Sequence, residues 1–300
     1  MSDNAIFFEK QLEYIKPGLY DVMFPNLQFA SGELIPIDSS VPTSAETITY
    51  NTYTRHGIAK IISDYSTDFA NADISGKQTT SAVKSVGSSF QYSIQELRAA
   101  EAGRMNLQAR KAEAAIEAIE QKMDSVAIDG DPDSGLFGLL THPNIGEYVV
   151  PNGALGSQLW ENKTPAEILK DMNSICSQSR LLSKGVEKAD TLLIPDTNYE
   201  YIQTTPRSGD SDLTILEYFK RNKPEITVVS VPKFTGKGQG GSGVMVAYER
   251  NSMKLTFEIP QAREIFPAQQ DALVFKVLVH ARTGGVIIYY PLSVTKAEGI

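Results

Sequence analysis

The stretch SIQELRAAEAGRMNLQARKAEAAIEAIEQKMDSVA, residues 93–127, decides the fold class of this chain. Ser93 and Glu96 form the S-x-x-E pattern of a capping box, in which each side chain accepts a backbone N–H left free at a helix start. Beyond them, apolar residues recur at spacings of three and four, namely Met105, Ala109, Ala112, Ile116, Ile119, Met123 and Val126. This period predicts one long helix, from about residue 94 to residue 128, with a single apolar face.

Such a helix is about 50 Å long, because each residue adds about 1.5 Å. Gly103 lies inside it and costs about 1 kcal/mol relative to alanine. Two partners for the apolar face remain open, a second helix in a coiled coil or the chain's own sheet. The stripe covers only about three heptads and is rich in alanine, which favours packing against the chain's own sheet.

The residues before the helix indicate an extended arm followed by a hairpin. Residues 1–45 carry Pro17, Pro25, Pro36 and Pro42, which disfavour helix. The run TITYNTYTRHGIAKIISDYS then alternates as a strand does, and VGSSFQYSI has the same character after the polar stretch TDFANADISGKQTTSAVKS. We therefore expect these two runs to pair, with the polar stretch as their tip. Such a hairpin has too little apolar area to stand alone in water.

An acidic loop, AIDGDPDSGLFGLLTHPNI, follows the helix. Asp129, Asp131 and Asp133 match the first ligand positions of a calcium loop. Ser134 stands where that loop needs its turn glycine, and Leu140 where it needs a bidentate glutamate. The mismatch favours an acidic turn without a metal.

A second module begins near residue 159. Thr164, Pro165 and Glu167 have the N-cap, N1 and N3 pattern of a helix that extends to about Leu182. Helices and strands then follow without regular β-α-β alternation, so the fold class is α+β rather than a doubly wound sheet. The last long run, ALVFKVLVHARTGGVIIYYPLSV, is expected to return to the sheet under the long helix.

The segment TGKGQGGSG, residues 235–243, contains the G-x-G-x-x-G pattern of a dinucleotide-binding loop. That loop needs a helix after its glycines, because the helix N-terminus holds the phosphates. Here the strand-like run VMVAYE follows, and no Gly-Lys-Ser/Thr is present. We therefore expect a strand–tip–strand hairpin, with Gly236, Gly238, Gly240 and Gly241 at its tip.

Composition argues against several classes of function. The formal net charge of −8 disfavours a nucleic-acid-coating surface, and no apolar run is long enough to cross a membrane. Cys176, the single cysteine, lies at helical spacing among apolar residues and is expected to be a packed, inert thiol. The three histidines have no metal-ligand spacing. The sequence therefore predicts no catalytic residue, no cofactor and no metal, and a protein that is not an enzyme.

The order of these pieces resembles the major capsid proteins of tailed bacteriophages, which have the Hong Kong 97-type fold. The phrases QYSIQELRAAEAG, AIDGDPDSGLFGLLTHPNI and HARTGGVIIYYPLSVTKAEGI are similar to that family as well. The resemblance implies an α+β chain built from an N-arm, an E-loop hairpin, a peripheral (P) domain with the spine helix, and an inserted axial (A) domain. The implied segments are residues 1–45 for the N-arm, 46–93 for the E-loop, 94–154 for the P domain, 155–265 for the A domain and 266–300 for the returning P-domain strands.

The resemblance also implies a function, namely self-assembly into hexamers and pentamers of an icosahedral virion shell that encloses viral DNA. The expected contacts between subunits involve Arg55, Lys60, Asp64, Lys77 and Arg282. Expected partners are sister copies, a portal, a decoration protein and packaged DNA without sequence-specific contacts, with assembly in the host cytoplasm and no membrane. Scaffolding is expected from a separate protein, unless a scaffolding segment has already been removed, and no covalent crosslink is predicted.

Two other functions remain open at this stage. One is an encapsulin-like nanocompartment, which shares the fold and encloses a cargo enzyme. The other is a nucleotide-dependent enzyme that uses the Gly236–Gly243 loop.

Overall fold

The computed structural model describes residues 27–57, 59, 71–103, 106–143, 145–209 and 212–300. Its helices are α1 (Ile94–Ala102), α2 (Leu107–Asp129), α3 (Pro165–Leu182), α4 (Asp196–Thr204) and α5 (Ile215–Asn222). Its strands are β1 (Ile37–Asp38), β2 (Thr47–Gly57), β3 (Ala72–Ala82), β4 (Lys84–Ser93), β5 (Gly146–Val149), β6 (Thr191–Pro195), β7 (Thr227–Val231), β8 (Val244–Tyr248), β9 (Leu255–Glu258), β10 (Gln261–Ile265), β11 (Gln269–Asp271), β12 (Val274–Thr283), β13 (Gly285–Ile288) and β14 (Val294–Glu298). Helices and strands are mixed without regular alternation, which confirms the α+β class.

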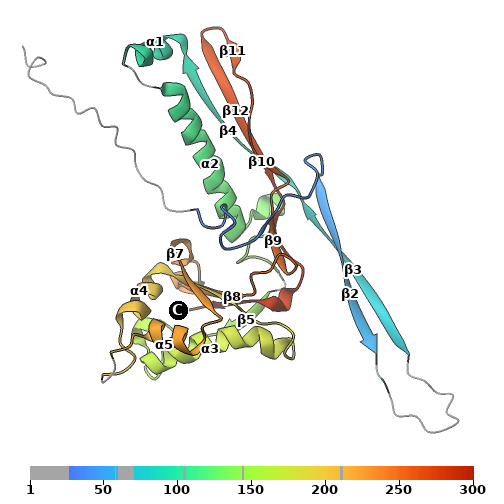
Figure 1. The fold of residues 1–300 in the computed structure, drawn as a ribbon, viewed down its shortest axis with the longest axis vertical. Coiled ribbons are helices and arrows are strands. Elements are labelled where there is room, and N and C mark those ends of the chain that lie inside the picture. The colour runs from blue at the N-terminus through green and yellow to red at the C-terminus, as the bar shows by residue number, and fades with distance from the viewer. Residues whose placement is uncertain (1–26, 58, 60–70, 104–105, 144, 210–211) are drawn as a thin grey trace, which may run out of the picture.

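The body has two parts, and a two-stranded hairpin projects from it (Figure 1). In the first part, the long-helix unit, β4 and β12 pair antiparallel over ten residues, and β10 and β11 add to β12. Helix α2 lies along β4 and β12. Its buried side chains include Ala115, Ile119, Met123 and Ala127, so its apolar face packs on the chain's own sheet, as expected.

The prediction of one continuous helix is wrong, because the chain forms α1 and α2 separately. The capping box of Ser93 and Glu96 opens α1 as expected, but Gly103 caps its C-terminus and Asn106 caps the start of α2. The Asn106 side chain accepts the Ala109 N–H at 3.2 Å. Gly103 ends one helix and Asn106, a strong N-cap residue, begins the next. These local preferences outweigh the continuous period of the apolar residues.

The second part, the five-strand unit, is a mixed sheet in the order β5-β14-β8-β6-β7. The capping box of Thr164 and Glu167 opens α3, as the sequence predicts. Alternate residues of β8 face opposite sides: Met245 and Ala247 join the core with α3, α4 and α5, whereas Val246 and Tyr248 join the core that α2 shares. Both faces of this sheet are therefore buried, which explains its nearly continuous apolar strands.

Strand pairing joins strands from different implied segments. β14, within residues 266–300, pairs with β8 and with β5 of residues 94–154 in the five-strand unit. β10, within residues 155–265, pairs with β12 in the long-helix unit. Between the two parts lies a small sheet in the order β1-β9-β13. Strand periodicity marks a strand but not its partner, so these pairings cannot be read from local pattern.

The described part of the arm packs onto the chain's own body. Phe29, Leu34 and Ile35 are buried in the core shared with α2. The carboxylate of Asp124 on α2 accepts the N–H groups of Phe29 at 2.9 Å and Ala30 at 3.1 Å. Residues 28–35 form turns and bends rather than an extended run, and their apolar side chains are covered within the same chain. Residues 1–26 lie outside the described part of the chain.

The expected glycine hairpin is also wrong. β7 and β8 do not pair, because β6 lies between them in the sheet. The segment between them crosses β6 and is tied to the body, since Lys237 Nζ contacts Asp129 at 2.6 Å and the Gln239 N–H donates to Glu298 at 3.2 Å. Gly236, Gly240 and Gly241 have positive φ angles that only glycine adopts easily, so the glycines shape a crossing connection rather than a projecting tip.

Within the described ranges, no helix is both long enough and apolar enough to span a bilayer.

Candidate functional site

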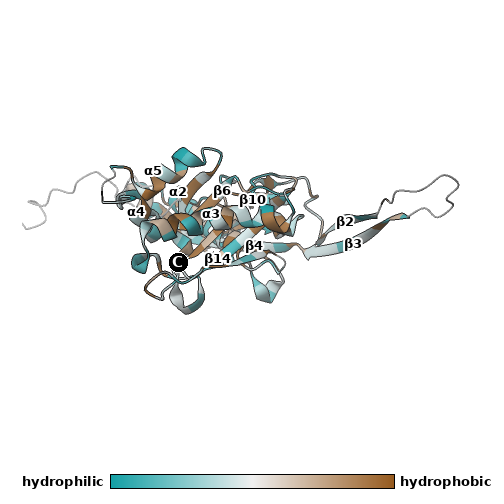
Figure 2. Cartoon of the chain, turned by 90° about the horizontal axis from the view of Figure 1, so that it is seen from below, coloured by the Kyte–Doolittle hydropathy of each residue, from teal (hydrophilic) through white to brown (hydrophobic). Residues whose placement is uncertain are grey.

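The most distinctive surface is the projecting hairpin of β2 and β3, which stands away from the body in two perpendicular views (Figures 1 and 2). Its register runs from Thr47 opposite Ala82 to Gly57 opposite Ala72. At about 3.3 Å per residue, these eleven pairs extend for about 36 Å.

The second strand of the hairpin is not the expected one. The predicted strand VGSSFQYSI is the main part of β4 and pairs with β12, whereas the predicted polar tip supplies β3. Most residues of β3 are exposed, and they include residues of both faces, so neither face needs a row of apolar side chains. Its β-branched residues Ile74, Thr79 and Thr80 were the remaining signal of a strand.

Polar contacts across the two strands hold the register of the hairpin. The hydroxyls of Thr49 and Thr80 lie 3.0 Å apart, and His56 Nε2 lies 3.0 Å from Ser75 Oγ. Within the described residues, β2 and β3 form a sheet of two strands. A two-stranded sheet is marginally stable at best in water, so this hairpin needs a further surface to cover it.

The root of the hairpin is fixed to the body by a few side chains. The ring of Tyr50 meets the ring of Tyr289 edge-on, with 5.2 Å between ring centroids. Ser81 Oγ donates to the Gly284 carbonyl at 3.2 Å. A Cβ on Gly284 would lie 2.8 Å from Ile48 Cδ1, so a larger residue at this position would displace the end of the Ile48 side chain.

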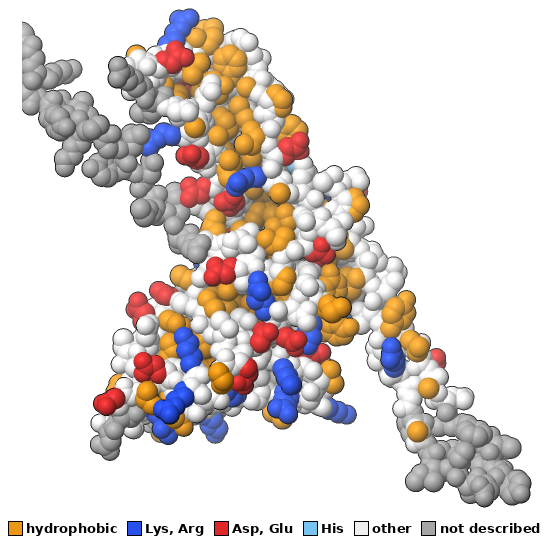
Figure 3. Space-filling model, viewed as in Figure 1, with side chains coloured by type: hydrophobic (Ala, Val, Ile, Leu, Met, Phe, Trp, Pro, Cys, Tyr) orange, Lys and Arg blue, Asp and Glu red, His pale blue; other side chains and the backbone are white. Residues whose placement is uncertain are grey.

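Beyond the root, one face of the hairpin carries exposed apolar and cationic side chains. Tyr53 is 68% exposed and Ile74 is 62% exposed. Arg55 lies directly opposite Ile74, and Tyr53 lies opposite Gly76, so all three side chains share one face. We call Tyr53, Arg55 and Ile74 the hairpin patch; orange and blue side chains stand out along this hairpin in Figure 3. Exposed apolar side chains on a projecting element are typical of a binding surface.

The predicted contact residues fall into three groups. Arg55 and Lys77 are both exposed on the hairpin, but Lys77 lies opposite Thr52 and so on the other face. Lys60 and Asp64 lie outside the described residues. Arg282 Nη1 donates to the Thr43 carbonyl of its own chain.

A buried carboxyl lies beneath the hairpin root. Glu258 ends β9 and is 1% exposed. Its Oε1 accepts the hydroxyls of Thr256 at 2.5 Å and Tyr289 at 3.3 Å, while its Oε2 is buried without a hydrogen-bond partner among the described residues. Burial raises the pKa of Glu258; the hydroxyl of Thr256 opposes that shift and the charge of Asp38 adds to it. Sequence reasoning missed this residue, because a single glutamate at a strand end carries no motif.

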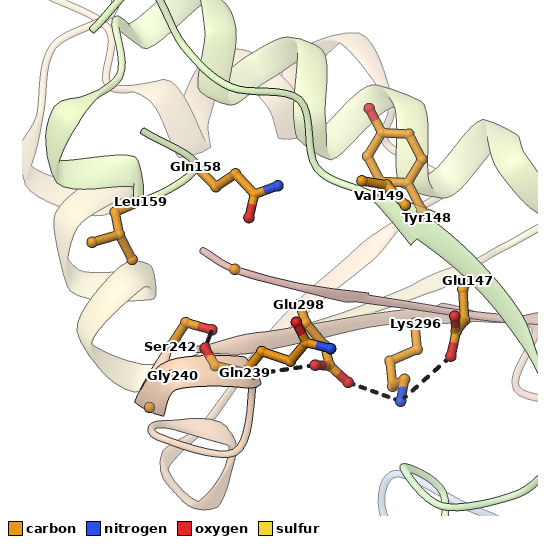
Figure 4. Close-up of a pocket in the computed structure, with 12 residues that line it drawn as sticks. Glu147, Tyr148, Val149, Gln158, Leu159, Gln239, Gly240, Ser242, Lys296 and Glu298 are labelled. Atoms are coloured by element: carbon orange, nitrogen blue, oxygen red, sulfur yellow. Dashed lines mark hydrogen bonds and ion pairs between the residues drawn. The ribbon is translucent and has the colours of Figure 1, made fainter. Parts of the chain in front are cut away.

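The glycine segment borders a depression of about 540 Å³, shown in Figure 4. Lys296 is the cation that lines it, and its Nζ lies 2.9 Å from Glu298 and 4.0 Å from Glu147. Two carboxylates therefore neutralise the group that would have to attract a phosphate. No helix follows the glycines, because β8 begins at Val244. These observations contradict a nucleotide site at Gly236–Gly243.

The acidic loop and the cysteine offer no reactive group. Asp129 is paired with Lys237, and Asp131 lies 3.5 Å from Lys122. In the described ranges, no group of three or more His, Cys, Asp or Glu side chains is placed to hold a metal. Burial raises the pKa of the Cys176 thiol to about 12, which keeps it protonated at neutral pH.

Comparison with known proteins identifies one matching family. The family model described as major capsid protein matches residues 57–300. No curated protein sequence gives a significant match.

Among solved structures, the capsid of Myoviridae phage XM1 has a TM-score of 0.85 at 19% identity and covers 99% of this chain and 100% of its own. The capsid of a native GTA particle has a TM-score of 0.69 at 10% identity, with 99% and 98% covered. A virus-like particle from Pyrococcus furiosus has a TM-score of 0.54 at 15% identity, with 91% and 96% covered. At these identities the likeness shows a shared fold, the Hong Kong 97-type capsid fold expected from the sequence.

Proposed function

The chain belongs to the major capsid protein family, whose model matches residues 57–300, and we propose that its copies assemble as hexamers and pentamers into an icosahedral shell enclosing viral DNA. The protein is then a structural component of a virion rather than an enzyme.

The observation that carries this proposal is the uncovered hairpin. A free two-stranded sheet is marginally stable, yet β2 and β3 form eleven residue pairs in a hairpin that projects from the body. Sister copies in a shell supply the missing cover, and their contacts offset the entropy lost when the hairpin is ordered. The hairpin patch of Tyr53, Arg55 and Ile74 is the surface that a neighbour covers.

The other partners follow from the same proposal. The net charge of −8 makes extensive phosphate contact unfavourable, so packaged DNA is held by confinement rather than by sequence-specific contacts. A portal and a decoration protein are further partners under this proposal, and assembly takes place in the host cytoplasm.

An encapsulin-like shell is the second candidate, because this fold is also similar to a virus-like particle. The higher TM-score to a phage capsid, 0.85 against 0.54, favours the virion. The contents of purified particles decide the question: viral DNA supports the virion, and a co-purifying cargo enzyme supports the nanocompartment.

The assembly proposal is tested with two matched variants of the hairpin patch. Tyr53→Ser with Ile74→Thr removes most of the apolar area of the patch, whereas Tyr53→Phe with Ile74→Val keeps most of it. We expect the first variant to remain a folded subunit by circular dichroism and to form few shells in sedimentation, and the second to assemble as the native chain does. Normal shells from both variants would contradict the role of the patch.

A further inference from the structure

A depression of about 600 Å³ lies in the five-strand unit, where α3 meets the starts of β6 and β7. Its apolar floor consists of buried residues, namely Cys176 of α3, Ala189 before β6 and Ile226 before β7. Ligand sites in proteins are typically concave, with volumes of about 300–1,000 Å³, an apolar lining and a few convergent polar groups. The size and the apolar floor of this depression fit that description.

Three cationic side chains also line the depression, and their charges are free. Arg180, Lys188 and Lys223 make no side-chain hydrogen bond or ion pair among the described residues. Arg180 lies in the last turn of α3 and Lys223 is the C-cap of α5, where the helix dipole favours a cation. Lys188 lies outside any helix, so its position has no such local explanation.

Most carboxylates that line the depression already have partners. Glu249 forms an ion pair with Lys254. Asp190 Oδ1 accepts the backbone N–H of Arg250 at 2.8 Å. Glu225 is the lining carboxylate that has no partner among the described residues. The free cations therefore outnumber the free carboxylate, and the depression carries a surplus of positive charge.

The turn that carries Val186 and Lys188 is fixed to the body. The Glu187 N–H donates to Ser183 Oγ at 2.8 Å, and the Glu187 carboxylate lies 2.5 Å from Lys254 Nζ. Val186 lines the depression and is 75% exposed, so this apolar side chain is left without cover. A wall that is already ordered loses little conformational freedom when a ligand binds.

We propose that this depression binds an acidic segment of a partner protein. An apolar side chain of that segment packs against the floor, and its carboxylates contact Arg180, Lys188 and Lys223. Hydrogen bonds between arginine and a carboxylate are strong, because both groups are charged and two N–H groups meet two oxygens. The phosphates of a nucleic acid would leave the apolar floor and Val186 uncovered, so an acidic peptide fits this depression better.

The occupant differs from the surface that sister copies use in the proposed shell. That surface, the hairpin patch, consists of Tyr53, Arg55 and Ile74 and carries a cation. Two cationic surfaces repel each other, so the hairpin patch does not complement this depression. The inference therefore goes beyond the proposed function, because it assigns a site to a second protein.

Binding of a fluorescein-labelled peptide to full-length subunits, followed by fluorescence anisotropy, tests this site. The probe is a short peptide in which pairs of glutamates alternate with leucine. Native subunits should bind it saturably. The variant Arg180→Gln with Lys188→Gln and Lys223→Gln should bind it about tenfold more weakly, because hydrogen bonds to charged groups are lost.

Matched single variants and a second peptide make the test specific. Lys188→Gln should weaken binding, whereas Lys170→Gln, an exposed lysine of α3 outside the depression, should bind as the native chain does. A peptide with serine in place of leucine should bind about tenfold more weakly, because it loses the apolar contact with the floor. Amide exchange should show protection by the first peptide at residues 183–190.

Several results would overturn the assignment. They are no saturable binding by native subunits, equal binding by the native chain and the triple variant, and binding of the serine peptide or of a DNA duplex as tight as that of the leucine peptide. A triple variant that is folded by circular dichroism but no longer forms shells would assign the depression to a sister copy, and would also overturn it. Because the peptide is bound by free subunits, failure of the chain to form shells would reject the proposed function and leave this site intact.

Discussion

Tyr50 of the projecting hairpin and Tyr289 of the body meet edge-on, with ring centroids 5.2 Å apart and ring planes inclined by 80°. Tyr289 also donates its hydroxyl to Glu258, at 3.3 Å. One ring therefore links the projecting hairpin to the buried carboxyl beneath it. The contact between the two rings, together with the hydrogen bond from Ser81 to Gly284, orients the hairpin relative to the body.

Replacing either ring should loosen the hairpin root without unfolding the body. Edge-to-face aromatic pairs contribute about 0.5–1.5 kcal/mol beyond their buried area. A double-mutant cycle of Tyr50→Leu and Tyr289→Leu, read from amide exchange of residues 47–50 and 79–82, should give a coupling of that size. The Tyr289→Phe variant keeps the ring and removes only its hydroxyl, so it should retain the coupling to Tyr50. A coupling near zero would mean that the rings do not hold the root.

Asp124 should stabilise the packing of residues 27–35 against α2. Its Oδ1 accepts the N–H groups of Phe29 and Ala30, and its Oδ2 lies 2.8 Å from Lys233 Nζ. Asp124→Ala leaves those two amides without an acceptor, at about 1–3 kcal/mol for each buried group. We expect a lower midpoint in urea and faster exchange of both amides. The exposed Asp133→Ala is the matched control, and an equal effect in both variants would contradict the assignment.

The buried ion pair of the five-strand unit should be intolerant of losing one partner. Lys163 Nζ lies 2.6 Å from Asp171 Oδ2, and both side chains are 1% exposed. Burial raises the pKa of Asp171, an effect that Lys163 opposes. Lys163→Met leaves a buried carboxylate uncompensated and should reduce the free energy of unfolding by about 3–5 kcal/mol.

The double variant Lys163→Met with Asp171→Leu should recover much of that loss, since no charge then remains buried. Chemical denaturation of both variants measures the difference. If the double variant is less stable than Lys163→Met alone, the explanation from desolvation is wrong.

His142 should make the body less stable in mild acid. Its side chain is buried against Phe137, and burial lowers its pKa from 6.5 to about 4. The unfolded chain therefore takes up a proton at higher pH than the folded chain, so stability is complete above about pH 6.5 and declines as pH falls toward 4. His142→Gln should flatten the change in urea midpoint between pH 7 and pH 5. The exposed His56→Gln should leave that change as it is in the native chain.

Local signals of the sequence predicted well where the structure depends on neighbouring residues alone. The capping boxes at Ser93 and Thr164 begin α1 and α3, and the apolar period identifies the buried face of α2. The glycine break at Gly284 separates β12 from β13, as the sequence indicated. These features need only the residues within one or two turns of chain.

Features that depend on distant partners were not predictable in the same way. The sequence predicts a polar tip where β3 lies, because a strand exposed on both faces has no apolar alternation. The pairing of β14 with β8 and the position of β6 between β7 and β8 join residues far apart in sequence. Asp124 is a buried acid on the apolar face of α2, and only the fold shows that it accepts the Phe29 and Ala30 amides.

The sequence predicts a projecting hairpin that the chain cannot cover alone, although with a different second strand, and this claim matters most for function. Amide hydrogen exchange of residues 47–57 and 72–82, compared between assembled particles and dissociated subunits, tests it directly. Because a neighbouring subunit is proposed to cover the hairpin patch, we expect strong protection of these amides in particles and rapid exchange in free subunits. Equal exchange rates in the two states would contradict the account.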